Sequence, residues 1–185
     1  MKALSFTFAM AVVPMALSAQ APTIPAADNL IAEGIPPLPA SLISEVRAYT
    51  ESRGAGLAAW HPLRKEMLIN TRFANTSQLH RVKFPGGART QITFYEDAVG
   101  GANYEPNEGR YFLFNKDAGG NEFSQIYRMD ADGKATLLTD GRRSQNGGGA
   151  WSRDGRRIAY SSTMRNGKDR DIRVMDPLDP ATDRV

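Results

Sequence analysis

Two histidines, His61 and His80, are the side chains of this sequence whose ordinary pKa suits proton transfer near neutral pH. Hydrolysis by a nucleophile requires a hydroxyl or thiol, a base within hydrogen-bond reach and donors for the oxyanion. The sequence has no cysteine, and no serine has glycine both two positions before and two after it, so the nucleophile elbow of α/β-hydrolases is absent. His61 lies between Trp60 and Pro62 in a predicted turn, and His80 lies in a predicted strand. We therefore predict structural roles for both histidines and no catalytic residue.

Carboxylates are the next candidates, and several fall in segments typical of turns: Asp130, Asp132, Asp169 and Asp171. In turns, their usual role is hydrogen bonding to the backbone, and a calcium site or a glycosidase pair is the alternative. Neither histidine has a partner spaced as a metal ligand, and no Lys-Ser/Thr pair follows Gly147–Gly149 as in a phosphate-binding loop. We predict no metal and no cofactor, and interpret these glycines as a close approach of the backbone near the axis of the fold.

The elements that position these residues form a repeat. An aromatic residue is followed by a turn signal and an apolar run in three places: "LAAWHPLRKEMLINTRF" at 57–73, "ANYEPNEGRYFLFNKD" at 102–117 and "WSRDGRRIAYSS" at 151–162. The aromatic residues are Trp60, Tyr104 and Trp151, at steps of 44 and 47 residues. The segments that begin at Ser77, Ser124 and Arg170 repeat at steps of 47 and 46 residues.

A period in the mid-forties that contains about four strand-like segments is typical of β-propeller blades. We predict an all-β fold of four-stranded antiparallel blades, at about 49–95, 96–141 and 142–185. "RTQITF" at 89–94 and "ATLLTD" at 135–140 are the outer strands of the first two blades, and the third blade has no counterpart. The propeller is therefore predicted to be incomplete, with two full blades and most of a third.

A blade cannot bury both of its faces alone, so its apolar residues must be covered by the neighbouring blades. We therefore expect Trp60, Tyr104 and Trp151 to pack as wedges between blades rather than to stack on a ligand. Asp154-Gly155 is expected to form a two-residue hairpin turn with positive φ.

Residues 1–19 have one charge, Lys2, followed by an uncharged run that ends at Ala19. This pattern predicts a secretory signal peptide cleaved after Ala19, or after Ala21 as a second choice, with a core segment or a membrane anchor as alternatives. Residues 20–48 are predicted to form an extended lead-in, with a short amphipathic helix starting near Ser41. We expect an exported protein, periplasmic or secreted, with no membrane association after cleavage.

Charge and composition favour an ordinary globular domain. Of the 185 residues, 41% are hydrophobic and 23% charged, and the formal net charge is +3. The densest basic segment, "RNGKDRDIR" at 165–173, is interrupted by acidic residues. A nucleic-acid partner is not expected, because it would require a basic face with interleaved aromatic residues.

Several longer blocks make the sequence similar to a known family. "WSRDGRRIAYSS", "DIRVMDPLDPATDR", "TRFANTSQLHRVKFPGGARTQITF" and "GGNEFSQIYRMD" resemble the N-terminal propeller of exported bacterial serine peptidases of the prolyl oligopeptidase family, over about residues 40–185. The first block is also similar to periplasmic TolB-type propellers and other WD-like repeats.

The resemblance implies a ring of about seven or eight blades that controls the access of peptide substrates to a C-terminal α/β-hydrolase domain in the same polypeptide. No catalytic residue of that domain has a counterpart here, so we expect the chain to be inactive alone, as a truncated product or fragment. The alternatives are a TolB-type propeller that binds another protein, and a propeller enzyme such as a polysaccharide lyase.

Overall fold

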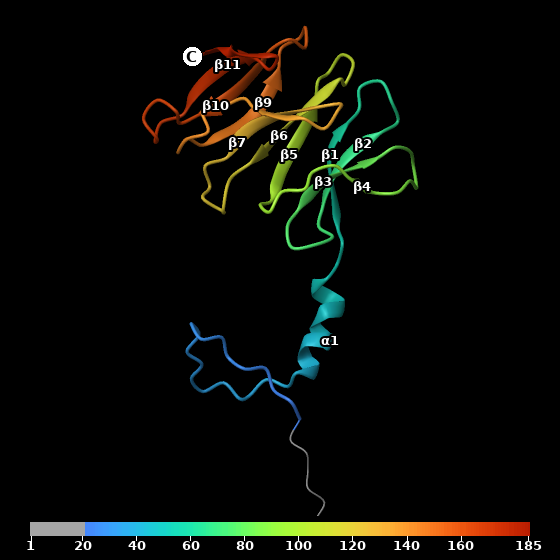
Figure 1. Ribbon diagram of the computed structural model, residues 1–185, viewed down its shortest axis with the longest axis vertical. Helices are drawn as coiled ribbons and strands as arrows, with labels where there is room; N and C mark the ends of the chain where they lie inside the picture. Colours follow the sequence, from blue (N-terminus) through green and yellow to red (C-terminus); the bar gives the residue numbers. More distant parts are fainter. Residues whose placement is uncertain (1–20) are drawn as a thin grey trace, which may run out of the picture. The chain divides into compact units, whose positions relative to one another are not determined.

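The computed structural model describes residues 21–185, so the predicted signal peptide at residues 1–19 lies outside the described residues (Figure 1). The chain divides into two compact units, with the boundary between Ser52 and Arg53.

In the first unit, residues 21–52 include the helix α1, which spans Ser41–Thr50. Before it, the Ile24 N–H donates to the Leu38 carbonyl at 2.8 Å, and an isolated β-bridge joins Thr23 and Pro39. The helix buries none of its residues, and Tyr49 is 85% exposed. Within residues 21–185, no helix is long and apolar enough to cross a membrane.

The second unit consists of three four-stranded antiparallel sheets, each in sequential strand order. The first sheet contains β1 (Ala55–Trp60), β2 (Met67–Thr71), β3 (Gln78–Val82) and β4 (Thr90–Gln91). The second contains β5 (Val99–Tyr104), β6 (Tyr111–Lys116), β7 (Gln125–Asp130) and β8 (Ala135–Leu137). The third contains β9 (Asn146–Trp151), β10 (Ile158–Ser162), β11 (Asp171–Asp176) and β12 (Asp179–Arg184).

The three sheets repeat one another in register. The residue that ends the first strand pairs with a residue at the start of the second in each sheet: Trp60 with Met67, Tyr104 with Phe112 (the second residue of β6), and Trp151 with Ile158. β5 lies against β1, and β9 lies against β7, so consecutive sheets are neighbours (Figure 1). This arrangement confirms the predicted all-β fold of propeller blades.

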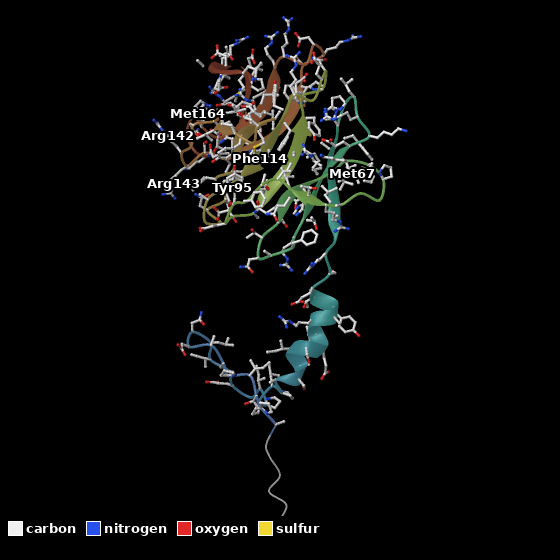
Figure 2. The ribbon with its side chains drawn as sticks, turned by 45° about the vertical axis from the view of Figure 1, so that its right-hand side comes forward. Met67, Tyr95, Phe114, Arg142, Arg143 and Met164 are labelled. Carbon is white, nitrogen blue, oxygen red and sulfur yellow. The ribbon has the colours of Figure 1, made fainter. Side chains whose placement is uncertain are left out.

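Two apolar cores hold the sheets together, one at each junction. The first contains Leu68 and Leu79 from the first sheet, and Phe112 and Phe114 from the second. Tyr95, in the connection between these sheets, stacks on Phe114 with ring centroids 5.9 Å apart (Figure 2). The second core contains six further residues around Tyr160: Tyr111, Leu113, Ile126, Leu138, Ile158 and Met175.

The third sheet has the outer strand that the sequence analysis did not find. β12 pairs with β11 through Val174 and Arg184, and through Asp176 and Asp179. Its sequence, DPATDR, has no apolar run and contains a proline, which is tolerated on an edge strand because the missing N–H is not needed there. The prediction that this blade is only partly present was therefore wrong in this detail.

Two predictions about glycines are corrected. A Cβ on any residue of Gly147–Gly149 would meet nothing within 4 Å in the described chain, so these glycines make no close approach there. Gly148 has φ +74°, beside an irregularity in the β9–β10 register, which explains the need for glycine. The Asp154-Gly155 turn lies in a loop of residues 152–157, where Gly155 alone has positive φ, at +70°.

Candidate functional site

Equivalent turns follow the first strand of each sheet, and a different side chain stabilises each one. In the first, His61 Nδ1 accepts hydrogen bonds from the Leu63 and Arg64 N–H groups at 3.1 and 3.2 Å. In the second, the Glu105 carboxylate accepts from backbone N–H groups, those of Asn107, Glu108 and Gly109. In the third, Ser152 Oγ accepts from the Arg157 N–H at 2.9 Å. The position requires an acceptor, and three different residue types provide one.

The environment of His61 keeps its imidazole neutral. Burial and the nearby Arg64 guanidinium lower the pKa of His61. The ring is 4% exposed and lies 4.8 Å from the Tyr104 ring. Because Nδ1 accepts two hydrogen bonds, the proton resides on Nε2, which is buried without a partner among residues 21–185. His61 therefore serves in packing and turn formation.

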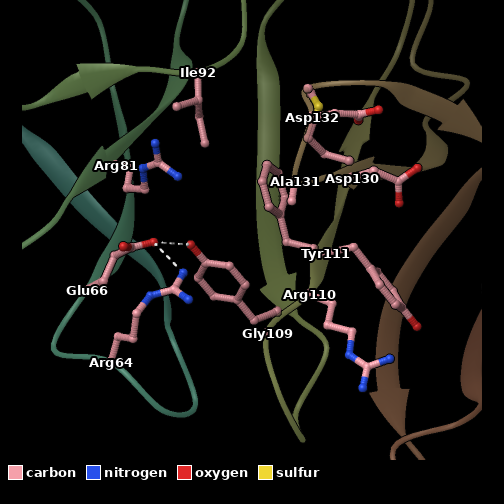
Figure 3. Close-up of a pocket in the computed structure, with 14 residues that line it drawn as sticks. Arg64, Glu66, Arg81, Ile92, Gly109, Arg110, Tyr111, Asp130, Ala131 and Asp132 are labelled. Carbon is pink, nitrogen blue, oxygen red and sulfur yellow. Dashed lines mark hydrogen bonds and ion pairs between the residues drawn. The ribbon is translucent and has the colours of Figure 1, made fainter.

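A cavity of about 270 Å³ lies between the first and second sheets, at the end where these turns are found (Figure 3). Glu66, just before β2, accepts hydrogen bonds from Tyr104 Oη at 3.1 Å and from Arg64 Nη2 at 3.4 Å. Burial would raise the pKa of the Glu66 carboxyl, but these hydrogen bonds outweigh it and hold the pKa below its usual value. Burial and the Glu66 charge raise the pKa of Tyr104, which remains a neutral donor.

The cavity has charged groups of both signs around it. Arg81 projects from β3 toward the space between the sheets, and Asp130 and Asp132 line the side formed by the second sheet (Figure 3). Asp130 is held by Arg128, with Nε and Oδ1 2.9 Å apart. Asp132 accepts the backbone N–H of Lys134 at 2.9 Å. Polar groups on rigid strands around a small cavity can bind and orient a ligand.

The opposite end of the strands is fixed by a repeated glutamine and threonine, whose role the sequence analysis missed. Gln78 Nε2 donates to the Tyr95 and Asp97 carbonyls, both at 3.0 Å. Gln125 Nε2 donates to the Arg142 and Ser144 carbonyls at 3.1 and 3.0 Å. These bonds tie the third strand of a sheet to the segment that leads into the next sheet. In the sequence, this role was indicated by the Ser-Gln pairs that begin at Ser77 and Ser124.

The threonines complete this arrangement. Thr93 Oγ1 accepts from the Leu79 N–H at 2.8 Å, and Thr139 Oγ1 accepts from the Ile126 N–H at 3.1 Å.

A second cavity of about 450 Å³ lies at this end of the strands, lined by Arg142, Arg143 and Met164 among others (Figure 2). Its lining makes it an open, polar depression between two loops.

The remaining carboxylates that the sequence singled out do not gather. Asp169 and Asp171 both lie near Arg165, at 3.6 and 2.8 Å, and thus form ion pairs at the loop before β11. His80 is 2% exposed and its ring lies 5.1 Å from that of Phe73. Within residues 21–185, no group of three histidine or acidic side chains could hold a metal ion.

The three aromatic residues differ in their surroundings. Tyr104 is 9% exposed and packs in the first core, and Trp151 is partly buried with its ring 6.2 Å from that of Tyr111. Both pack between sheets, as predicted. Trp60 is 61% exposed, so its predicted packing between blades is wrong in the described chain. The physical reason is that Tyr104 and Trp151 face the preceding sheet, and residues 21–54 form no sheet before the first one.

Comparison with solved structures supports the propeller fold. No family model matches the sequence, and no curated protein matches it either. A structure assigned to TolB from Agrobacterium tumefaciens superposes with a TM-score of 0.55 at 22% identity, covering 69% of this chain and 47% of the other. TolB from Acinetobacter baumannii gives a TM-score of 0.52 at 25% identity, with 68% and 31% covered.

A prolyl endopeptidase structure gives a TM-score of 0.53 at 14% identity, covering 70% of this chain and 21% of the other. The chain thus spans less than half the length of each of these structures. At such identities, the likeness shows the fold, and the same fold serves different functions.

Proposed function

We propose that residues 55–184 contribute three consecutive blades to a β-propeller ring that admits or binds other polypeptides. The observation that carries this proposal is a difference in exposure among three equivalent residues, one on the third strand of each sheet. Leu79 is 0% exposed and Ile126 is 2% exposed, because the following sheet covers each of them. Ile172, at the same place in the third sheet, is 63% exposed. An apolar face of this kind is suited to a further sheet.

The face of the first sheet that is turned away from the second sheet also exposes apolar side chains. Trp60 corresponds to Tyr104, which the first sheet covers, and Leu57 on the same strand is 55% exposed. Phe73 is 43% exposed beside His80. Trp60 at one end of the three-sheet arc and Ile172 at the other are thus exposed, although Tyr104 and Ile126 at the equivalent positions are buried, which supports a ring with more blades.

We propose the role of the ring from its relatives. In the first reading, it belongs to an exported serine peptidase of the prolyl oligopeptidase type and controls the access of peptides to an α/β-hydrolase domain. The sequence blocks at residues 71–94, 119–130, 151–162 and 171–184 support this reading. In the second reading, it is a protein-binding propeller of the TolB type, and the two TolB structures favour this one. Export would follow from the signal-like segment that ends at Ala19.

The experiment is to determine the coding sequence beyond the codon for Val185, and to treat the protein from its native source with a fluorophosphonate probe. Further blades followed by a G-x-S-x-G elbow, together with covalent labelling, would support the peptidase reading. A ring that closes with no hydrolase domain, and no labelling, would reject it and favour the binding propeller. Absence of any further sheet would reject the ring itself.

A further inference from the structure

Arg81 and Arg128 occupy equivalent places in neighbouring sheets. Arg81 on β3 pairs across the strands with Leu68 on β2, and Arg128 on β7 pairs with Leu113 on β6. The segments around them, SQLHRVK and SQIYRMD, match position by position. Each arginine faces the sheet that follows its own, so the two sites can be compared directly.

Arg128 has a full set of acceptors. Its Nε donates to Asp130 Oδ1 at 2.9 Å, and its Nη2 donates to Asp130 Oδ2 at 3.0 Å. Its Nη1 donates at 2.7 Å to the Pro177 carbonyl, in the turn between β11 and β12 of the third sheet. The paired bonds to one carboxylate are the strongest arrangement available to a guanidinium, and they are formed by a residue two positions further along the chain.

Arg81 lacks this partner. The residue two positions after it is Lys83, a cation that accepts no hydrogen bond. Its Nε is buried and has no hydrogen-bond partner within residues 21–185. A guanidinium stays charged at any relevant pH, so a partly buried one without an acceptor is unfavourable.

The neighbouring carboxylates form their hydrogen bonds with other groups, although the Glu66 charge lies near enough to Arg81 to interact with it electrostatically. Glu66 accepts from Arg64 and Tyr104, and Asp130 is held by Arg128. Asp132 accepts the Lys134 N–H of its own turn, and Arg110, which also lines the cavity, is paired with Glu108. Arg81 is therefore the cation of this cavity whose acceptor is missing (Figure 3).

We propose that the cavity between the first and second sheets binds the carboxylate of a ligand, which takes at Arg81 the place that the Asp130 carboxylate takes at Arg128. With a volume of about 270 Å³, the cavity suits the carboxyl end of an extended peptide rather than a folded segment. The inference does not depend on whether the ring is a peptidase gate or a binding propeller.

The test uses the full chain labelled with ¹⁵N and follows the side-chain Nε–H signals of its arginines. The probes are N-acetyl-dialanine with a free carboxylate, the same peptide as its amide, and inorganic phosphate. The free acid is expected to shift the Arg81 signal with a Kd on the order of 1 mM, and to leave the Arg128 signal in place. The amide is expected to shift neither signal.

The variant Lys83→Asp supplies the missing internal carboxylate, and it should weaken binding of the free acid by about tenfold or more. Lys83→Met is the matched control, because it removes the charge of the lysine without adding a carbonyl or carboxylate acceptor, and it should retain binding. Arg81→Gln should abolish it. The proposal is overturned if the amide binds with the same affinity as the free acid, or if Lys83→Asp binds the free acid like the wild type. It is also overturned if inorganic phosphate shifts the Arg81 signal and the free acid does not.

Discussion

Ile126 and Ile172 allow the blade arrangement to be tested by one pair of matched substitutions. The two residues occupy the same place on β7 and β11, but Ile126 is 2% exposed and Ile172 is 63% exposed. Replacing each with alanine removes the same three carbon atoms. The difference between the two variants therefore reports how completely a following sheet covers the site.

The magnitude follows from the burial. Three buried carbon atoms are worth about 2.4 kcal/mol of transfer free energy, at roughly 0.8 kcal/mol each, and the cavity left behind brings the cost of Ile126→Ala to about 3 kcal/mol. For Ile172→Ala, most of the side chain is already in water, so the loss in unfolding free energy should stay below about 1 kcal/mol.

The assay is urea unfolding of the full chain, followed by tryptophan fluorescence. With a slope of about 1–3 kcal/mol per molar urea, Ile126→Ala should lower the midpoint by on the order of 1 M or more, and Ile172→Ala by much less. Equal losses in both variants would refute the reasoning, because the third sheet would then be covered as the second is. In a longer chain that contains the next blade, the cost of Ile172→Ala should rise to that of Ile126→Ala.

Two further predictions concern the turns and connections. Gln125→Ala removes the hydrogen bonds that Nε2 donates to the Arg142 and Ser144 carbonyls and the one that Oε1 accepts from Thr139 Oγ1. It should therefore lower the free energy of unfolding in urea by about 3 kcal/mol. The exposed Lys134→Ala should change it by less than about 0.5 kcal/mol. For Glu105, burial would raise the carboxyl pKa, but three backbone N–H donors outweigh it and lower the pKa, so its contribution is present above the ordinary pKa of about 4.3 and is lost as the pH falls through the folded-state pKa. The difference in urea midpoint between wild type and Glu105→Gln should therefore shrink on acidification from pH 7, and a difference that stayed constant down to about pH 2 would contradict this.

The parts of the fold that could be predicted from the sequence are those in which neighbouring residues carry the signal. The apolar runs at Met67–Ile69 and Tyr111–Phe114 and the Ser-Gln pairs recur because each blade must bury the same inner positions. β12 could not be predicted in this way, because an edge strand needs backbone hydrogen bonds more than apolar side chains. Hydrophobic pattern identifies covered strands better than outer ones.

The candidate site shows a second reason why prediction by residue type fails. His61, Glu105 and Ser152 each accept backbone N–H groups in the turn after the first strand of their own sheet, yet a search for catalytic chemistry singled out only the histidine. The reverse holds at Arg81 and Arg128, which are the same residue type but differ in their hydrogen-bond partners. Arg128 is bonded to Asp130, whereas the equivalent position after Arg81 is Lys83. In a repeat protein, the informative signal is a departure from the pattern of the equivalent positions. A residue that keeps its type but loses its partner marks a place where something else can bind.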